Sequence, residues 1–102
     1  MIARIWRGET TAADADAYLD YLRRTSVQET PAIPGNRGMQ ILRRINGDRA
    51  EFITIIRWDS VDAIRAFAGD DIERAVFYPE DDRYLVRKEL TVAHNEIVAE
   101  ER

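Results

Sequence analysis

His94 is the only histidine among the 102 residues, and its surroundings suggest acid–base chemistry. It lies in TVAHNEIVAE (residues 91–100), where alternating polar and apolar residues are typical of a strand. Side chains two positions apart share one face of a strand, so the Glu96 carboxylate could orient or charge the imidazole. A general base that works near neutral pH needs such tuning. The pair predicts a catalytic base, His94, assisted by Glu96; the alternative is a half-exposed strand histidine on a charged surface.

Four other residues are candidates for contact with a small-molecule substrate. Trp58 ends a strand-like run, where a large aromatic side chain serves either burial or ligand contact. Tyr78 and Tyr84 flank PEDDR (79–83), a loop that could line a pocket mouth or whose aspartates could serve a turn. Arg43 interrupts an apolar face, and a buried arginine requires a carboxylate or an anionic ligand. For Arg43 we expect pairing with one of the 19 acidic side chains.

Other kinds of site lack the residues they need. The chain has no cysteine, which excludes disulfides and thiolate chemistry. One histidine with scattered carboxylates has no recognisable metal-ligand spacing. PGNRG (34–38) lacks the spacing and the lysine of a phosphate-binding loop. A hydrolytic triad needs a serine near His94, whereas Ser26 and Ser60 suit a helix end and a helix cap. We therefore predict neither a metal nor a cofactor.

Length and composition limit the class of protein. The chain is long enough for one small domain, residues 1–102, and its 45% hydrophobic and 33% charged residues are ordinary for a folded protein. A net charge of −4 argues against non-specific binding to nucleic acid. No apolar run reaches the roughly 20 residues of a membrane span, and MIARIWRGE lacks the features of a signal peptide. We expect a cytoplasmic protein that contacts neither nucleic acid nor membrane.

The first elements that must position these side chains are a strand and a helix. IARIWR (2–7) predicts a strand because β-branched and aromatic residues dominate it. Thr11 and Asp14 form an acidic variant of the capping box. The apolar spacing that follows predicts a helix to about residue 25. Residues 30–38 then form the longest loop.

A hairpin occupies the middle of the chain. GMQILRRI (38–45) and AEFITIIRW (50–58) flank Asn46-Gly47, which predicts a type I′ turn with Ile45 opposite Asp48. One face of the hairpin is nearly all apolar and suits helices packed above it. The other face is mixed, but it carries three apolar side chains that also need cover: Leu42, Ile53 and Ile55.

The remaining elements complete a β-α-β-β-α-β order. Ser60 caps a second predicted helix, which Gly69 interrupts and a second capping box restarts over residues 70–76. Pro79 either ends this helix or opens a short turn, and a final strand spans about 90–99. The fold class is therefore α+β, a ferredoxin-like antiparallel sheet with helices on one face. A second copy packed sheet to sheet would cover the other face, which predicts a homodimer.

One stretch carries a resemblance to a known family. IRWDSVDAIRAF (56–67), a strand that ends in Trp-Asp-Ser and enters an amphipathic helix, resembles the dimeric α+β barrel superfamily. More narrowly, it resembles the antibiotic biosynthesis monooxygenase-like group, and FAGDDIERAVFYPEDDRYL (67–85) resembles an uncharacterised bacterial branch of that group. The resemblance implies a homodimeric barrel with a pocket between sheet and helices in each subunit. It also implies relatives that include cofactor-free oxygenases of quinols or polyketides, haem-degrading enzymes and proteins without a known reaction.

The chain departs from that group at two positions. Many enzymatic members carry a histidine in the second helix, where this chain reads Phe67-Ala68-Gly69. The haem-degrading members share an Asn, Trp and His set, but the first strand offers Trp6 and Arg7 where the Asn is expected. These departures disfavour haem degradation. Two hypotheses follow: a cofactor-independent monooxygenase-like enzyme for a small aromatic or quinone-type compound, or a non-catalytic dimeric module that binds a small molecule or scaffolds a partner.

Overall fold

The strand β1 (Ile2–Thr11) runs through the middle of a five-stranded antiparallel sheet in the computed structural model, which describes residues 1–101. One edge of β1 pairs with β3 and the other edge pairs with β4 and β5, so that the sheet order is β2-β3-β1-β4 with β5 beside β1. The remaining strands are β2 (Asn36–Asn46), β3 (Arg49–Trp58), β4 (Leu85–Lys88) and β5 (Ala93–Glu96).

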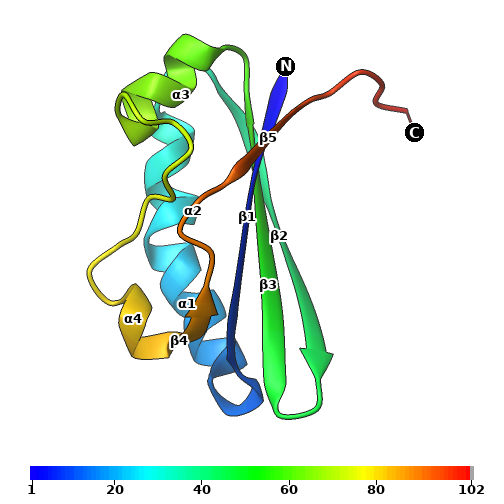
Figure 1. Cartoon of the computed structure of the whole chain (residues 1–102), viewed down its shortest axis with the longest axis vertical. Helices are drawn as coiled ribbons and strands as arrows, with labels where there is room; N and C mark the ends of the chain where they lie inside the picture. The colour runs from blue at the N-terminus through cyan, green and yellow to red at the C-terminus, as the bar shows by residue number, and fades with distance from the viewer. Residues whose placement is uncertain (102) are drawn as a thin grey trace.

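All helices lie on one face of this sheet (Figure 1). They are α1 (Ala15–Arg24), α2 (Ser26–Glu29), α3 (Val61–Ala68) and α4 (Asp81–Tyr84), with short 3₁₀ turns at Ala12–Asp14 and Thr30–Ala32. The predicted α+β class with an antiparallel sheet is confirmed. Within residues 1–101, no helix is long and apolar enough to cross a membrane.

The predicted cap forms one turn ahead of α1. The Thr11 side chain accepts a hydrogen bond from the Asp14 N–H at 3.2 Å and so caps the 3₁₀ turn Ala12–Asp14, whereas Asp14, the N-cap of α1 itself, makes no side-chain cap bond. The buried side chains of α1 pack on the half of the sheet next to the hairpin turn, in a cluster made of Ala15, Tyr18, Tyr21, Leu22, Ala50 and Phe52. A second cluster of Ile56, Trp58 and Ile64 holds α3 on the half of the sheet at the other end of β3.

The central hairpin has the predicted faces and a different register. Ile45 pairs with Ala50 rather than Asp48, a shift of two residues. The turn therefore consists of Gly47 and Asp48, and Gly47 alone has positive φ (64°), the pattern of a type II′ rather than a type I′ turn. Because strand side chains alternate with period two, a two-residue shift leaves every side chain on its predicted face.

The helix predicted for residues 70–76 does not form. The Asp71 carboxylate accepts the Glu73 N–H at 3.3 Å, a local turn that replaces a helix start. The Ala75 N–H donates to the Leu90 carbonyl at 2.9 Å, and the Val92 N–H donates to the Glu73 carbonyl at 2.8 Å. Because these bonds satisfy amides and carbonyls that a helix would use, residues 69–80, here called the cover segment, run irregularly from α3 to α4.

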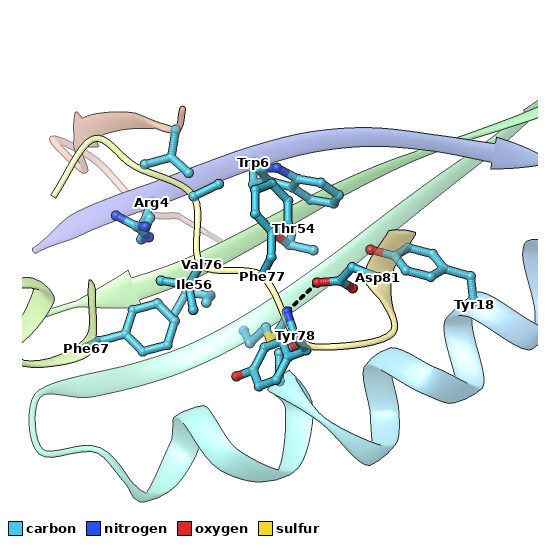
Figure 2. Close-up of a pocket in the computed structure, with 14 residues that line it drawn as sticks. Arg4, Trp6, Tyr18, Thr54, Ile56, Phe67, Val76, Phe77, Tyr78 and Asp81 are labelled. Carbon is cyan, nitrogen blue, oxygen red and sulfur yellow. Dashed lines mark hydrogen bonds between the residues drawn. The ribbon is translucent and has the colours of Figure 1, made fainter. Parts of the chain in front are cut away.

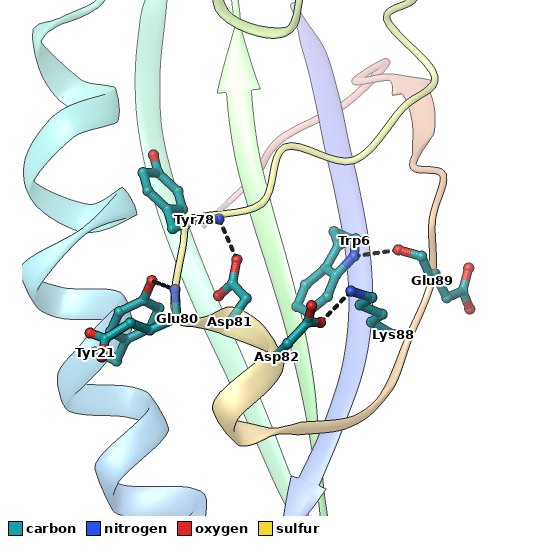
Figure 3. A network of polar contacts seen from close by, with 8 residues as sticks. All are labelled: Trp6, Tyr21, Tyr78, Glu80, Asp81, Asp82, Lys88 and Glu89. Atoms are coloured by element: carbon teal, nitrogen blue, oxygen red, sulfur yellow. Dashed lines mark hydrogen bonds and ion pairs between the residues drawn. The ribbon is translucent and has the colours of Figure 1, made fainter.

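The predicted last strand is divided in two. β4 was not expected, and β5 covers only the middle of the predicted range 90–99. Between them, Trp6 Nε1 donates to the Glu89 carbonyl at 2.8 Å. Lys88 forms an ion pair with Asp82 of α4, and the Glu80 N–H donates to Tyr21 Oη at 3.0 Å (Figure 3). This network ties α4 to both the sheet and α1.

Candidate functional site

A cavity of about 50 Å³ lies between the two core clusters, under the cover segment. The sheet contributes its floor, and the cover segment contributes Ala75 to Tyr78 (Figure 2). Five aromatic residues line it: Trp6, Tyr18, Phe67, Phe77 and Tyr78. The cavity therefore offers apolar surroundings for a planar group.

Arg4 places a buried positive charge at this cavity. Its side chain is on the helix-facing side of β1, the residue is only 3% exposed, and the guanidinium lies 5.6 Å from the centre of the Phe67 ring. Nη1 donates to the Ile72 carbonyl at 2.6 Å and Nη2 donates to the Arg74 carbonyl at 2.7 Å. Burial lowers the pKa of Arg4 to about 10, and no carboxylate within residues 1–101 forms an ion pair with it.

His94 contacts Arg4 rather than the predicted Glu96. The two residues are opposite each other on β5 and β1, with 3.0 Å between Arg4 Nη1 and His94 Nε2. Burial, followed by the Arg4 charge, lowers the pKa of His94, and the carboxylate that opposes this shift is Glu73. Glu96 is exposed beside Ile2, with no hydrogen bond to His94. The imidazole is half-buried and supports the guanidinium from behind the cavity wall.

Asp81 places a buried carboxylate at the other end of the cavity from Arg4 (Figure 2). It is 5% exposed, and Oδ2 accepts the Tyr78 N–H at 2.6 Å, so Asp81 has the turn role that the sequence offered as one of two alternatives. Burial raises the pKa of Asp81, against the opposing effects of the Tyr78 N–H and Lys88. Burial also raises the pKa of Tyr78 to about 12, which keeps this phenol neutral.

The four predicted substrate contacts lie in different places. Tyr78 lines the cavity. Trp58 is 0% exposed and packs on Phe67 with 5.3 Å between ring centres, which makes it a core residue next to the cavity. Tyr84 packs against the tyrosines of α1. The Arg43 side chain is 35% exposed and pairs with Asp16 at 2.7 Å, as its expected carboxylate partner.

Sequence reasoning missed Arg4, although a usable signal was present. Arg4 interrupts the alternation of Ile2 and Trp6 on the helix-facing side of β1, just as Arg43 interrupts its own strand. A charged residue at an inward position of a central strand is more informative than one near a hairpin end, because it cannot reach solvent. Within residues 1–101, no group of three or more histidine, aspartate and glutamate side chains is arranged to hold a metal ion.

Solved structures with the same fold include enzymes and haem-binding proteins. A putative antibiotic biosynthesis monooxygenase from Bacillus cereus has a TM-score of 0.69 at 10% identity, over 99% of this chain and 96% of that chain. The haem degrader MhuD from Mycobacterium tuberculosis, with two haems bound in its active site, has a TM-score of 0.63 at 19% identity, over 100% of both chains. A MhuD mutant with two manganese protoporphyrin IX molecules per active site has a TM-score of 0.62 at 21% identity, over 100% of this chain and 99% of that chain. At these identities the likeness concerns the fold alone.

Sequence comparison identifies the family. No curated protein matches the chain. The sequence model of the antibiotic biosynthesis monooxygenase family matches residues 1–76, about three quarters of the 102 residues. This range contains β1 to β3 and α3, and it includes the stretch 56–67 that carried the resemblance. The chain belongs to the antibiotic biosynthesis monooxygenase family.

Proposed function

We propose that the protein is a cofactor-independent monooxygenase that oxidises a small aromatic or quinone-type compound in the cavity beneath the cover segment. The observation that carries the proposal is the pairing of aromatic walls with two buried charged groups, Arg4 and Asp81, at opposite ends. Family membership supports the reaction class.

The chemistry requires a base, molecular oxygen and a dry pocket. Asp81 removes a proton from an acidic carbon of the substrate, such as a methylene activated by an adjacent phenolic ring, and leaves a stabilised carbanion. This anion transfers electrons to O₂ and forms a C–O bond with it, and the peroxide anion takes the proton back from Asp81. The hydroperoxide then loses water as its carbon becomes a carbonyl. One oxygen atom stays in the product and the other leaves in water, and the four electrons that reduce O₂ come from the oxidation of the methylene to the carbonyl. A carboxylate whose pKa is raised by burial is a stronger base than an exposed one.

His94 has a supporting role in this scheme. Arginine has no acceptor, so the His94–Arg4 hydrogen bond requires a neutral imidazole whose Nε2 accepts. We therefore propose His94 as a positioning residue that acts through Arg4. Direct base catalysis by His94, assisted by Glu96, stays a prediction.

A ligand must displace part of the cover segment. The cavity of about 50 Å³ is smaller than the roughly 300–1,000 Å³ typical of ligand pockets. The Ser26 hydroxyl lines this cavity and has no hydrogen-bond partner within residues 1–101, so a ligand would satisfy it. Haem, which MhuD binds, does not fit these residues, because the single histidine is held by Arg4 outside the lining.

We also propose that the protein is a homodimer through the sheet face opposite the helices. On that face Leu42 is 43% exposed, and Ile53 and Ile55 are half-buried beside it. A second copy would remove these apolar side chains from water and leave the helix-covered cavity separate in each subunit.

Oxygen uptake tests the proposed reaction. Purified protein is incubated with a panel of hydroquinones and phenolic ring compounds that carry an activated methylene, and oxygen consumption is followed. We expect enzyme-dependent uptake with incorporation of one ¹⁸O atom from ¹⁸O₂. Saturable binding of panel members without uptake would favour the alternative, a dimeric module that binds a small molecule without converting it.

A further inference from the structure

We infer that the ligand is an anion, an aromatic carboxylate or a compound of similar charge, whose oxygen atoms bind the Arg4 guanidinium. This inference rests on the proposed function only in using the same cavity. It names the charge of the ligand and the atoms that bind it.

Arg4 has donors left for such a group. A guanidinium carries five N–H donors. Nη1 contacts the Ile72 carbonyl and His94 Nε2, and Nη2 contacts the Arg74 carbonyl. Within residues 1–101, this leaves Nε–H and one Nη2–H of Arg4 without an acceptor. Nε and Nη2 lie on the same edge of the guanidinium. We assign the Arg74 carbonyl to the Nη2–H that points away from this edge, which leaves the edge able to bind both oxygen atoms of a carboxylate.

The electrostatics of the site also call for an anion. All three acceptors around Arg4 are uncharged: two carbonyl groups and an imidazole. A buried charge without a counter-ion is unfavourable, and the lowered pKa of Arg4 reflects that cost. Asp81, the buried carboxylate of the cavity, lies at the opposite end (Figure 2). A negatively charged ligand would neutralise Arg4 at the place where its free donors are.

The aromatic walls determine the rest of the ligand. Phe67 lies under the guanidinium, and Trp6 and Phe77 contact each other edge to face with 6.1 Å between ring centres. A flat ring attached to the anionic group would extend from Arg4 along this wall toward Asp81. In a ligand that does not react, a ring hydroxyl at its far end would take the place of the activated methylene next to the Asp81 carboxylate. These features describe a hydroxylated aromatic acid.

Matched ligands test the inference without altering the protein. Binding of 4-hydroxybenzoate and of 4-hydroxybenzamide, which has the same shape and no charge, is measured by titration calorimetry. The amide should bind about 10-fold more weakly or worse, because charge-assisted bidentate hydrogen bonds are lost. The Arg4 Nε–H resonance in ¹H–¹⁵N spectra should move downfield with the carboxylate and stay in place with the amide.

Two variants give an independent comparison. Arg4→Gln should lose the preference for the carboxylate. Arg23→Gln should keep it, because Arg23 is exposed on α1 and its one ion pair within residues 1–101 is with Asp20. Equal affinity for the two ligands in the unmodified protein, no saturable binding of the carboxylate, or an unmoved Arg4 Nε–H resonance at saturation would each overturn the inference.

The same experiments separate this inference from the proposed reaction. Carboxylate-selective binding at Arg4, together with no oxygen uptake on any compound of the panel, would refute the reaction and leave the anion site standing. Oxygen uptake on uncharged quinols, with no preference for an anion, would support the reaction and refute the anion site.

Discussion

Arg4 Nη1 and His94 Nε2 lie 3.0 Å apart across two paired strands, and this contact fixes the state of the imidazole. Because the guanidinium can only donate, Nε2 must accept and the proton must lie on Nδ1. A protonated His94 would lose this hydrogen bond and place two positive charges together. The contact therefore links the charge of His94 to the position of Arg4.

The first prediction concerns the pH dependence of stability. Burial and Arg4 lower the pKa of His94 below its usual 6.5. Above pH 6.5, His94 is neutral in both the folded and the unfolded chain, and its contribution to stability is fully present. As the pH falls below 6.5, the unfolded chain takes up a proton first, so the free energy of unfolding decreases until the pH passes the folded-state pKa.

Denaturant unfolding at about pH 7.5 and about pH 5 measures this effect. His94→Gln retains an acceptor for Arg4 and cannot titrate, so it should lose less stability on acidification than the unmodified protein. An equal loss in both proteins would contradict the lowered pKa.

The second prediction compares two carboxylates that could act on His94. Glu73 raises the pKa of His94, so Glu73→Gln should lower that pKa further. Glu96→Gln should leave it unchanged, because Glu96 is exposed and has no hydrogen bond to the imidazole. NMR titration gives a single pair of imidazole signals, since the chain contains one histidine. A change in the pKa of His94 with Glu96→Gln but not with Glu73→Gln would mean that Glu96 acts on His94, as the sequence predicted.

The third prediction concerns the proposed base. Asp81→Asn keeps an oxygen that can accept the Tyr78 N–H and removes the basic carboxylate, so oxygen uptake should fall by about 10²- to 10⁴-fold. With Asp81 present, the rate should rise with pH through its pKa, which burial places above the ordinary 3.8. Asp82→Asn is the control, because Asp82 is exposed and pairs with Lys88. Full activity in Asp81→Asn would exclude this residue as the base.

The fourth prediction concerns the hairpin turn. Gly47 has φ of 64° and a Cβ there would meet nothing within 4 Å, so Gly47→Val tests backbone strain alone. It should lower the free energy of unfolding by about 1 kcal/mol or more. Asn46→Val should be tolerated, because no residue other than glycine has positive φ within residues 1–101. A type I′ turn would make both substitutions costly, so thermal unfolding of the two variants distinguishes the turns.

The fifth prediction concerns assembly. Sedimentation equilibrium at micromolar concentration should give the mass of a dimer. Ile55→Glu should dissociate or unfold it, because an unpaired buried charge costs several kcal/mol. Val61→Glu should leave the dimer intact, since Val61 is exposed at the start of α3 on the other side of the sheet. A monomeric unmodified protein would refute the proposed interface.

The sequence predicted which side of the sheet each hairpin residue faces and which residues cap the helices, but it did not predict the register in which β2 and β3 pair. Alternation along β2 and β3 determines which side each residue faces, but it is satisfied equally well by pairings two residues apart. The caps at Thr11 and Ser60 are local, and both side chains accept the expected N–H groups. Ser60 accepts the Ala63 N–H at 3.1 Å and caps α3, whereas Thr11 caps the 3₁₀ turn that leads into α1. The capping pattern at residues 70–73 starts no helix, because the Asp71 carboxylate accepts the Glu73 N–H locally. The Glu73 carbonyl and the Ala75 N–H bond to residues 92 and 90, partners that no local pattern reveals.

The candidate site was predicted in part for the same reason. For the loop after Tyr78 the sequence left a pocket mouth and a turn open; Tyr78, a candidate contact, lines the cavity, and so does Asp81, which was expected only to serve the turn. The contact between Arg4 and His94 joins positions 90 residues apart, and periodicity within one strand cannot select the partner across the sheet. Glu96 was chosen because it is near His94 in sequence, whereas the contact of His94 is set by the pairing of β5 with β1.

The central position of β1 also has a consequence for how the chain folds. One edge of β1 pairs with β3, and its other edge pairs with residues between 85 and 96. These last pairings close loops that include most of the chain, and their entropic cost must be met before they gain any packing energy. We therefore expect the hairpin and α3 to form early and β4 and β5 to dock late. Until they dock, one edge of β1 has unpaired backbone groups, and the folding intermediate is open to aggregation at that edge.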